Sequence, residues 1–146
     1  MRRILFALCL ALLVIPGCGG DDNPANSGGR LVVDESFTLN GNEFKDYSFS
    51  VDTNVEQNVS LEGEFSASGG NIDVAVMTQE VFQAWVGGGA ISSVLYGSGR
   101  VSSDRFSLPI EEPGTFYLVF SNAFGETAAK TVNAEFRLFS TVESEL

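Results

Sequence analysis

Histidine is absent from this 146-residue sequence, and its two cysteines, Cys9 and Cys18, both lie near the N-terminus. Histidine is the commonest general base and metal ligand, so its absence excludes Ser–His–Asp and Cys–His catalysis. The chain beyond Cys18 has no thiol, and we expect it to fold without a disulfide. Carboxylate catalysis is conceivable, but the obvious pair, Glu111-Glu112, would point to opposite faces of an extended strand. We therefore predict that the protein is not an enzyme.

Basic residues are also scarce, with 8 Lys and Arg against 19 Asp and Glu and a net charge of −11. The acidity is spread along the chain and does not form one run, which is typical of a solvated surface. Such a surface repels nucleic acid, so we expect no nucleic-acid partner. A calcium site would have to use carboxylates such as Asp73, Asp104, Glu111 and Glu112. No Asp-x-Asp-x-Asp loop is present, and we predict neither a metal nor a cofactor.

Only one long apolar run occurs, at residues 4–15 (ILFALCLALLVI), directly after Met1-Arg2-Arg3. A membrane-spanning helix needs about 20 apolar residues, so this run is too short to cross a bilayer. A positive start followed by a short apolar run is typical of a secretory signal peptide. Pro16-Gly17 then interrupts any helix before Cys18.

The stretch 15–18 (IPGC) resembles a lipobox, the processing site of bacterial lipoproteins. The resemblance implies cleavage before Cys18, diacylglycerol on its sulfur, and further fatty acylation such as palmitate on the new amine. Two or three acyl chains hold a protein on a membrane far more firmly than one. We therefore expect a lipid-anchored protein of the bacterial cell envelope. Gly19 stands where an aspartate would resemble an inner-membrane retention signal, which favours the outer membrane in a Gram-negative cell.

The chain divides into a signal peptide (1–17), a lipidated cysteine with a Gly- and Asn-rich flexible tether (18–30), one domain (31–142) and a disordered tail (143–146). Period-two alternation of apolar and polar residues recurs along the domain, as expected of strands with one buried face. The stretch 115–120 (TFYLVF) is apolar at both phases, as in a central strand. The alternation and the turn signals between runs predict an all-β antiparallel sandwich or jelly roll of seven or eight strands.

One segment, Thr78–Trp85, instead favours a short helix packed over the end of the sandwich. Thr78 is suited to cap it, and Gly87-Gly88-Gly89 to end it. Phe82 and Trp85 on this helix, together with Tyr96, form a candidate ligand-binding platform. A single tryptophan on a short helix is more often a lid over the core, so the sequence favours that interpretation and leaves the platform as the alternative.

Two stretches, 69–76 (GGNIDVAV) and 112–122 (EPGTFYLVFSN), the second followed by Lys130-Thr131-Val132, resemble the GOLD (Golgi dynamics) β-sandwich domain and its bacterial relatives. The resemblance covers roughly Ser36 to Leu138 and implies the fold. Eukaryotic members include luminal domains of vesicle cargo receptors and carry a disulfide that has no counterpart here. A shared fold does not transfer their function.

The same residues have structural roles that follow from their chemistry. Pro113 presets φ and Gly114 permits a positive φ, which makes a tight turn into the next strand. Asn122 can bond neighbouring backbone where that strand ends, and Lys130 is expected near Asn122 or an acidic loop.

The sequence as a whole favours a non-catalytic interaction or accessory module that binds a protein partner in the envelope. Its sandwich edges or the segment Thr78–Leu95 would make the contact. The alternatives are a carbohydrate-binding module that uses Trp85 and nearby aromatic residues, and a structural lipoprotein without a specific ligand.

Overall fold

A computed structural model describes residues 28–142 except 92 and 125–126. The predicted signal peptide, Cys18, nearly all of the tether and the predicted tail lie outside these residues. None of the helical residues that the structure describes forms a segment long and apolar enough to cross a bilayer.

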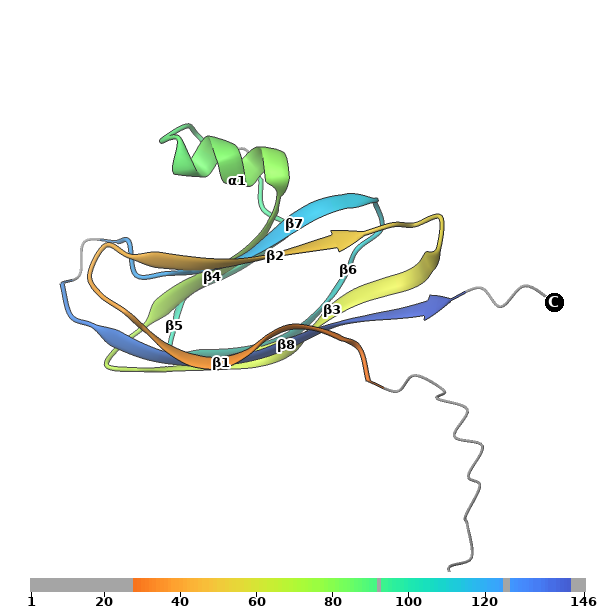
Figure 1. The fold of residues 1–146 in the computed structure, drawn as a ribbon. Coiled ribbons are helices and arrows are strands. Elements are labelled where there is room, and N and C mark those ends of the chain that lie inside the picture. The colour runs from red at the N-terminus through yellow and green to blue at the C-terminus, as the bar shows by residue number, and fades with distance from the viewer. Residues whose placement is uncertain (1–27, 92, 125–126, 143–146) are drawn as a thin grey trace, which may run out of the picture.

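Two four-stranded antiparallel sheets face each other in a sandwich (Figure 1). Sheet A contains, in spatial order, β1 (Arg30–Leu39), β8 (Lys130–Val142), β3 (Glu56–Ser68) and β6 (Ser103–Pro109). Sheet B contains, in spatial order, β2 (Phe44–Val51), β7 (Gly114–Ser121), β4 (Ile72–Thr78) and β5 (Tyr96–Val101). The helix α1 (Gln79–Val86) lies between β4 and β5 in the chain.

The strands pair in a nested order, with β1 beside β8, β2 beside β7, β3 beside β6 and β4 beside β5. This order is that of a jelly roll, in which a long antiparallel hairpin is rolled into two sheets. The predicted all-β fold, with eight strands and one short helix, is confirmed.

The core lies between the sheets and is built by the predicted alternation. On β7, Phe116, Leu118 and Phe120 point inward and are almost completely buried. Phe120 lies at the centre, where its ring meets those of Phe65 at 6.0 Å and of Phe136 at 6.2 Å. Aromatic contacts of this kind add to the stability gained by burying the rings.

Sequence alternation did not predict β5, and it predicted a turn at Ser102-Ser103-Asp104, where β6 has in fact begun. The sequence of β5, YGSGRV, contains two glycines and few residues that favour strands. Its backbone is held extended by pairing with β4, a long-range interaction that local preference does not report.

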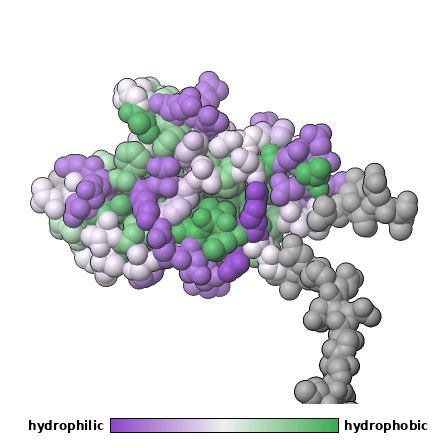
Figure 2. Space-filling view, viewed as in Figure 1, coloured by the Kyte–Doolittle hydropathy of each residue, from purple (hydrophilic) through white to green (hydrophobic). Residues whose placement is uncertain are grey.

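At each open edge of the sandwich, a hydrogen bond from a tyrosine to a carboxylate links the two sheets. At the edge formed by β1 and β2, the Tyr47 hydroxyl donates to Glu35, and the Lys45 ammonium donates to the same carboxylate at 2.7 Å. Figure 2 views this edge and shows an apolar patch between the sheets, flanked by polar residues. At the opposite edge, the Tyr96 hydroxyl of β5 donates to Asp104 of β6. These bonds span the two sheets where no backbone pairing does.

Candidate functional site

Helix α1 begins and ends where the sequence predicts. Thr78 caps it, since its hydroxyl accepts a hydrogen bond from the Val81 N–H at 3.4 Å. Val86 is the last helical residue, and Gly88 follows at a φ of +76°. The prediction that the helix covers the end of the sandwich is wrong. The helix lies on the outer face of sheet B, against β7 and β4 (Figure 1).

The helix lies on this face because β4 and β7 carry apolar side chains at both phases. Met77 and Val119 point away from the core, yet each is only 2% exposed. Phe82 of α1 stacks on Tyr117 of β7, with the ring centroids 3.9 Å apart and the planes 5° apart. The predicted two-sided burial of residues 115–120 is thereby confirmed, with the core on one face and α1 on the other.

Trp85, one turn further along α1, meets a residue that the sequence did not single out. Its ring contacts Phe44 of β2 edge-on at 4.7 Å, and Phe82 at 6.2 Å. Phe44 is itself 40% exposed. Phe82 and Trp85 therefore lie together in an aromatic cluster that is half covered by the sheet and half open to solvent.

Tyr96 does not join this cluster. It pairs in register with Val76, whose side chain points into the core, so Tyr96 lies on the inner face of sheet B. There its ring stacks on Phe106 at 3.8 Å and its hydroxyl donates to Asp104. The candidate platform of Phe82, Trp85 and Tyr96 is thus divided between opposite faces of one sheet.

Exposed apolar side chains are concentrated around α1. Figure 1 shows that the connection from α1 to β5 passes back beside the helix. We use the term α1 surface for the group of apolar residues exposed around this helix. Its members are Trp85, Phe44 (40% exposed), Val86 (54%), Ile91 (42%), Val94 (39%) and Leu95 (46%). Among the described residues, the other large apolar side chains with comparable exposure are Leu31 and Val55. No other described region gathers so much exposed apolar surface.

A cleft of about 430 Å³ continues the α1 surface toward the turn between β6 and β7. Leu95 and Phe116 line it, and Glu111 and Glu112 flank it. Both glutamates lie in that turn and not on a strand, so the predicted opposition of their side chains across a strand does not arise.

The acidic residues considered for calcium lie in different environments. Asp104 accepts the Tyr96 hydroxyl, and Asp73 lies on the outer face of β4, opposite Arg100 of β5. Within the described residues, no three acidic side chains lie close enough to hold a metal ion.

Asn122 and Lys130, which belong to the GOLD-like stretch, lie completely buried at one end of the sandwich. The Asn122 amide donates to the carbonyls of Asn40 at 3.0 Å and Ala128 at 2.9 Å, and its Oδ1 atom is buried without a partner. The Lys130 ammonium donates to the Asn71 carbonyl at 2.6 Å. Asn122 therefore bonds neighbouring backbone as predicted, and the two side chains tie together the turns at this end.

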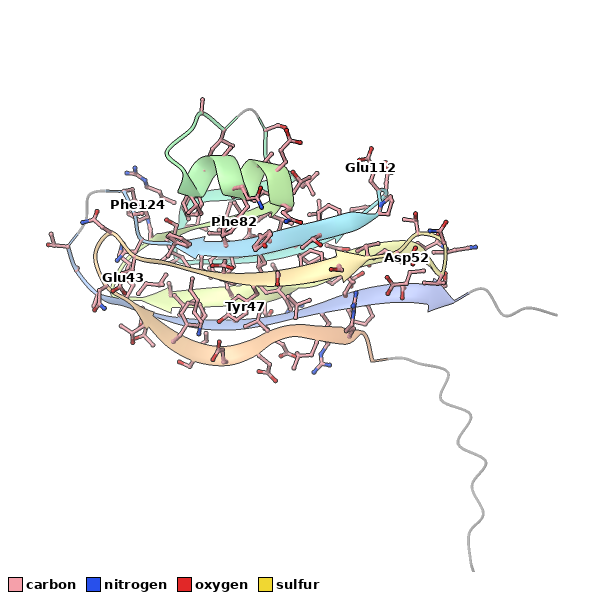
Figure 3. All side chains as sticks on the ribbon, turned by 45° about the horizontal axis from the view of Figure 1, so that its top comes forward. Glu43, Tyr47, Asp52, Phe82, Glu112 and Phe124 are labelled. Carbon is pink, nitrogen blue, oxygen red and sulfur yellow. The ribbon has the colours of Figure 1, made fainter. Side chains whose placement is uncertain are left out.

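Phe124, in the connection between β7 and β8, lies between two cations at the same end. The Lys130 ammonium is 4.5 Å from its ring centroid and the Arg100 guanidinium 4.4 Å. Figure 3 shows Phe124 at the end of the sandwich that also carries Glu43. These contacts hold Lys130 in a buried, structural position.

The outer face of sheet A is polar and contrasts with the α1 surface. It carries a shallow trough of about 680 Å³ lined mainly by hydroxyl, carboxylate and amide side chains. Two ion pairs lie on this face, Arg105 of β6 with Glu64 of β3, and Arg137 with Glu135 along β8. Each of these two arginines is thus paired with a glutamate on this face.

Sequence reasoning missed Phe44 and Tyr117 as members of the aromatic cluster. A signal was present for Phe44, because it is out of phase with Tyr47, Phe49 and Val51, the inward residues of β2. An aromatic residue at the outward phase of a strand indicates a second packing partner on that side. The sequence alone did not reveal that this partner is Trp85.

No protein-family model matches the chain, and no curated protein matches it at a significant level.

Proposed function

We propose that this protein is a lipid-anchored lipoprotein of the bacterial cell envelope that binds a protein partner through the α1 surface. The observation that carries the binding role is the exposed apolar group around α1, which stands out from the polar outer face of sheet A. Clustered apolar exposure of this kind is typical of interaction sites. Aromatic residues such as Trp85 and Phe44 are also enriched at the centres of protein interfaces.

The position of the proposed anchor suits this role. β1 enters the domain through sheet A, whereas α1 lies on the outer face of sheet B (Figure 1). A tether that leads to a lipid on Cys18 would hold the domain from the side away from α1. The α1 surface then stays free to meet another envelope protein.

The jelly roll agrees with the fold that the GOLD-like stretches imply, and we propose this parentage for the domain. Residues of those stretches have structural roles in the fold. Pro113-Gly114 forms a turn with Gly114 at a φ of +146°, and Asn122 and Lys130 are buried. In this proposal the residues of the GOLD-like stretches maintain the sandwich, while the α1 surface carries recognition.

The experiment is site-specific photocrosslinking in the native envelope. A photoreactive residue at Val86 is expected to capture a discrete partner, whereas the same residue at Ser66, on the outer face of sheet A, is expected to capture much less. Equal capture at both positions, or none at Val86, would overturn the binding role.

The anchor is tested separately by membrane fractionation of the Cys18→Ser variant. We expect the variant to leave the membrane fraction and to lack the acyl mass on its N-terminal peptide. A variant that remains in the membrane would contradict the proposed anchor without bearing on the α1 surface.

A glycan-binding role keeps one observation in its favour, the half-open pair of Trp85 and Phe44. Sugar rings bind by stacking on aromatic faces. Trp85 is the single tryptophan of the chain, so its fluorescence reports directly on this site. A saturable change on adding envelope oligosaccharides would favour the glycan role over a protein partner.

A further inference from the structure

Acidic side chains border the α1 surface. Asp46 lies on the outer face of β2, opposite Val119 in register and two residues from Phe44. Glu80 is exposed in the first turn of α1, and Glu112 is exposed beside the cleft that Leu95 lines. Figure 3 shows Glu112 on the same side of the molecule as Phe82.

Several acids elsewhere in the described part of the chain are held in ion pairs, whereas these three carboxylates are not. The ion pairs of the described residues join Arg30 to Glu56, Lys45 to Glu35, Arg105 to Glu64 and Arg137 to Glu135. None of these pairs includes Asp46, Glu80 or Glu112. Lys130 is buried in the core, and Arg100, the basic residue of the described part that reaches the outer face of sheet B, lies over Phe124.

An apolar surface with an acidic border selects its partner by charge. An anionic partner would meet repulsion at the border, whereas a cationic one would gain attraction and faster association. A lipid surface rich in anionic headgroups is disfavoured for the same reason, as is nucleic acid.

We infer that the occupant of the α1 surface is a cationic amphipathic segment of an envelope protein, with an apolar stripe bordered by lysine or arginine. This inference rests on the proposed function and adds the chemical class of the partner. The apolar stripe would cover Trp85, Val86 and Leu95, and the basic residues would reach Asp46 and Glu112. Helices that lay an apolar face on a hydrophobic surface in this way are a common mode of recognition.

The test is a fluorescence titration of the full-length protein held in phosphatidylcholine vesicles, with Trp85 as the reporter. Three helical peptides without tryptophan share one leucine stripe and differ in having lysine, glutamine or glutamate on the polar face. We expect the lysine peptide to shift the Trp85 emission with a saturable curve. Its affinity should exceed that of the glutamate peptide at least about tenfold and should fall as NaCl is raised.

Two charge-reversal variants separate a local border from the overall acidity of the chain. Asp46→Lys with Glu112→Lys alters the α1 border, while Asp34→Lys with Glu62→Lys makes the same change in net charge on sheet A. We expect the first pair to weaken binding of the lysine peptide about fivefold, and the second to change it less than twofold. Equal weakening by both pairs would show that only net charge matters and would overturn the inference.

The remaining outcomes distinguish this inference from the proposed function. Equal binding of all three peptides would overturn the cationic partner but support an apolar docking surface. A response of Trp85 to none of them would overturn the inference, while the crosslinking at Val86 decides the binding role independently. A Trp85 shift on adding phosphatidylglycerol vesicles without peptide would point to a lipid surface and also overturn it.

Discussion

Gly63 shows how closely the sheets are packed at a single residue. It lies in the middle of β3 and pairs with Phe136 of β8 on one side and Phe106 of β6 on the other. A Cβ atom at this position would come within 2.1 Å of the Glu135 carbonyl oxygen and 2.4 Å of the Phe136 ring. The aromatic ring thus occupies the volume that any other residue's side chain would need.

We expect Gly63→Ala to lower the free energy of unfolding by about 3 kcal/mol, because both strands must separate to admit the methyl group. Urea unfolding followed by Trp85 fluorescence measures the change. Gly97→Ala in β5 is the control, since its Cβ would make an ordinary contact with Val94 at 3.5 Å. A Gly63→Ala protein as stable as the control variant would contradict the close packing.

The direction of the hydrogen bonds at Asn122 gives a second prediction. Its amide nitrogen donates to backbone carbonyls in a fully buried site. Asn122→Asp keeps the shape but places an acceptor against those carbonyls, and should cost about 3 kcal/mol of stability or more. The same change at the exposed Asn133 should cost less than about 0.5 kcal/mol. Chemical denaturation of both variants checks this, and equal losses would refute the role assigned to Asn122.

Among the elements, α1 and β7 depend on each other. β7 has apolar side chains on both faces, and α1 has no fully buried residue of its own. The helix is therefore held mainly by the contact of its half-buried aromatic face with sheet B, since an isolated helix of this length is not stable in water.

Phe82→Ala removes the stacking on Tyr117 and should cost about 2 kcal/mol, less than for a fully buried phenylalanine because the site is partly open. The Trp85 emission should shift to longer wavelength as α1 loosens and its ring gains water. Gln83→Ala, on the exposed side of the helix, serves as the comparison and should leave both readouts near the wild-type values. An unchanged emission spectrum for Phe82→Ala would show that α1 does not depend on this stack.

At the scale of the whole molecule, the open edge formed by β1 and β2 links the stability of the sandwich to pH. The hydrogen bond from Lys45 and then that from Tyr47 hold the pKa of the Glu35 carboxyl below its ordinary value of 4.5. Burial, and then the nearby Glu35 carboxylate, raise the pKa of Tyr47, so its hydroxyl remains a donor to Glu35 at neutral pH. The link between the sheets is therefore strongest when Glu35 is ionised.

The sign of the pH effect follows from the lowered pKa. The contribution of Glu35 to stability is complete above the unfolded-state pKa and is lost as the pH falls through the folded-state pKa. We expect Glu35→Gln to be less stable than the wild type at pH 7, with the difference shrinking below about pH 4.5. Urea unfolding across pH 3 to 7 measures it. Asp34→Asn, on the outward face of the same strand, should follow the wild-type profile, and a constant deficit for Glu35→Gln would contradict the linkage.

The candidate site was only partly accessible to sequence reasoning. The helix, its cap at Thr78 and the choice of Phe82 and Trp85 as candidate residues followed from local chemistry and spacing. Phe44, 41 positions before Trp85, joined the site because β2 and β4 flank β7 in one sheet. Tyr96 is not part of the site, because its pairing with Val76 places its side chain on the inner face of sheet B.

Local chemistry along the chain was sufficient for the strand pattern, the central place of residues 115–120 and the limits of α1. Alternation and capping act over a few residues, so they can be recognised in the sequence alone. Three features could be seen only in the folded molecule. They are the nested strand order, the existence of β5, and the proximity of the exposed apolar residues to acidic side chains around α1. These features depend on backbone pairing and packing between segments that are distant in the sequence. Alternation of apolar and polar residues indicates which face of a sheet a side chain lies on, but not which residues it packs against there.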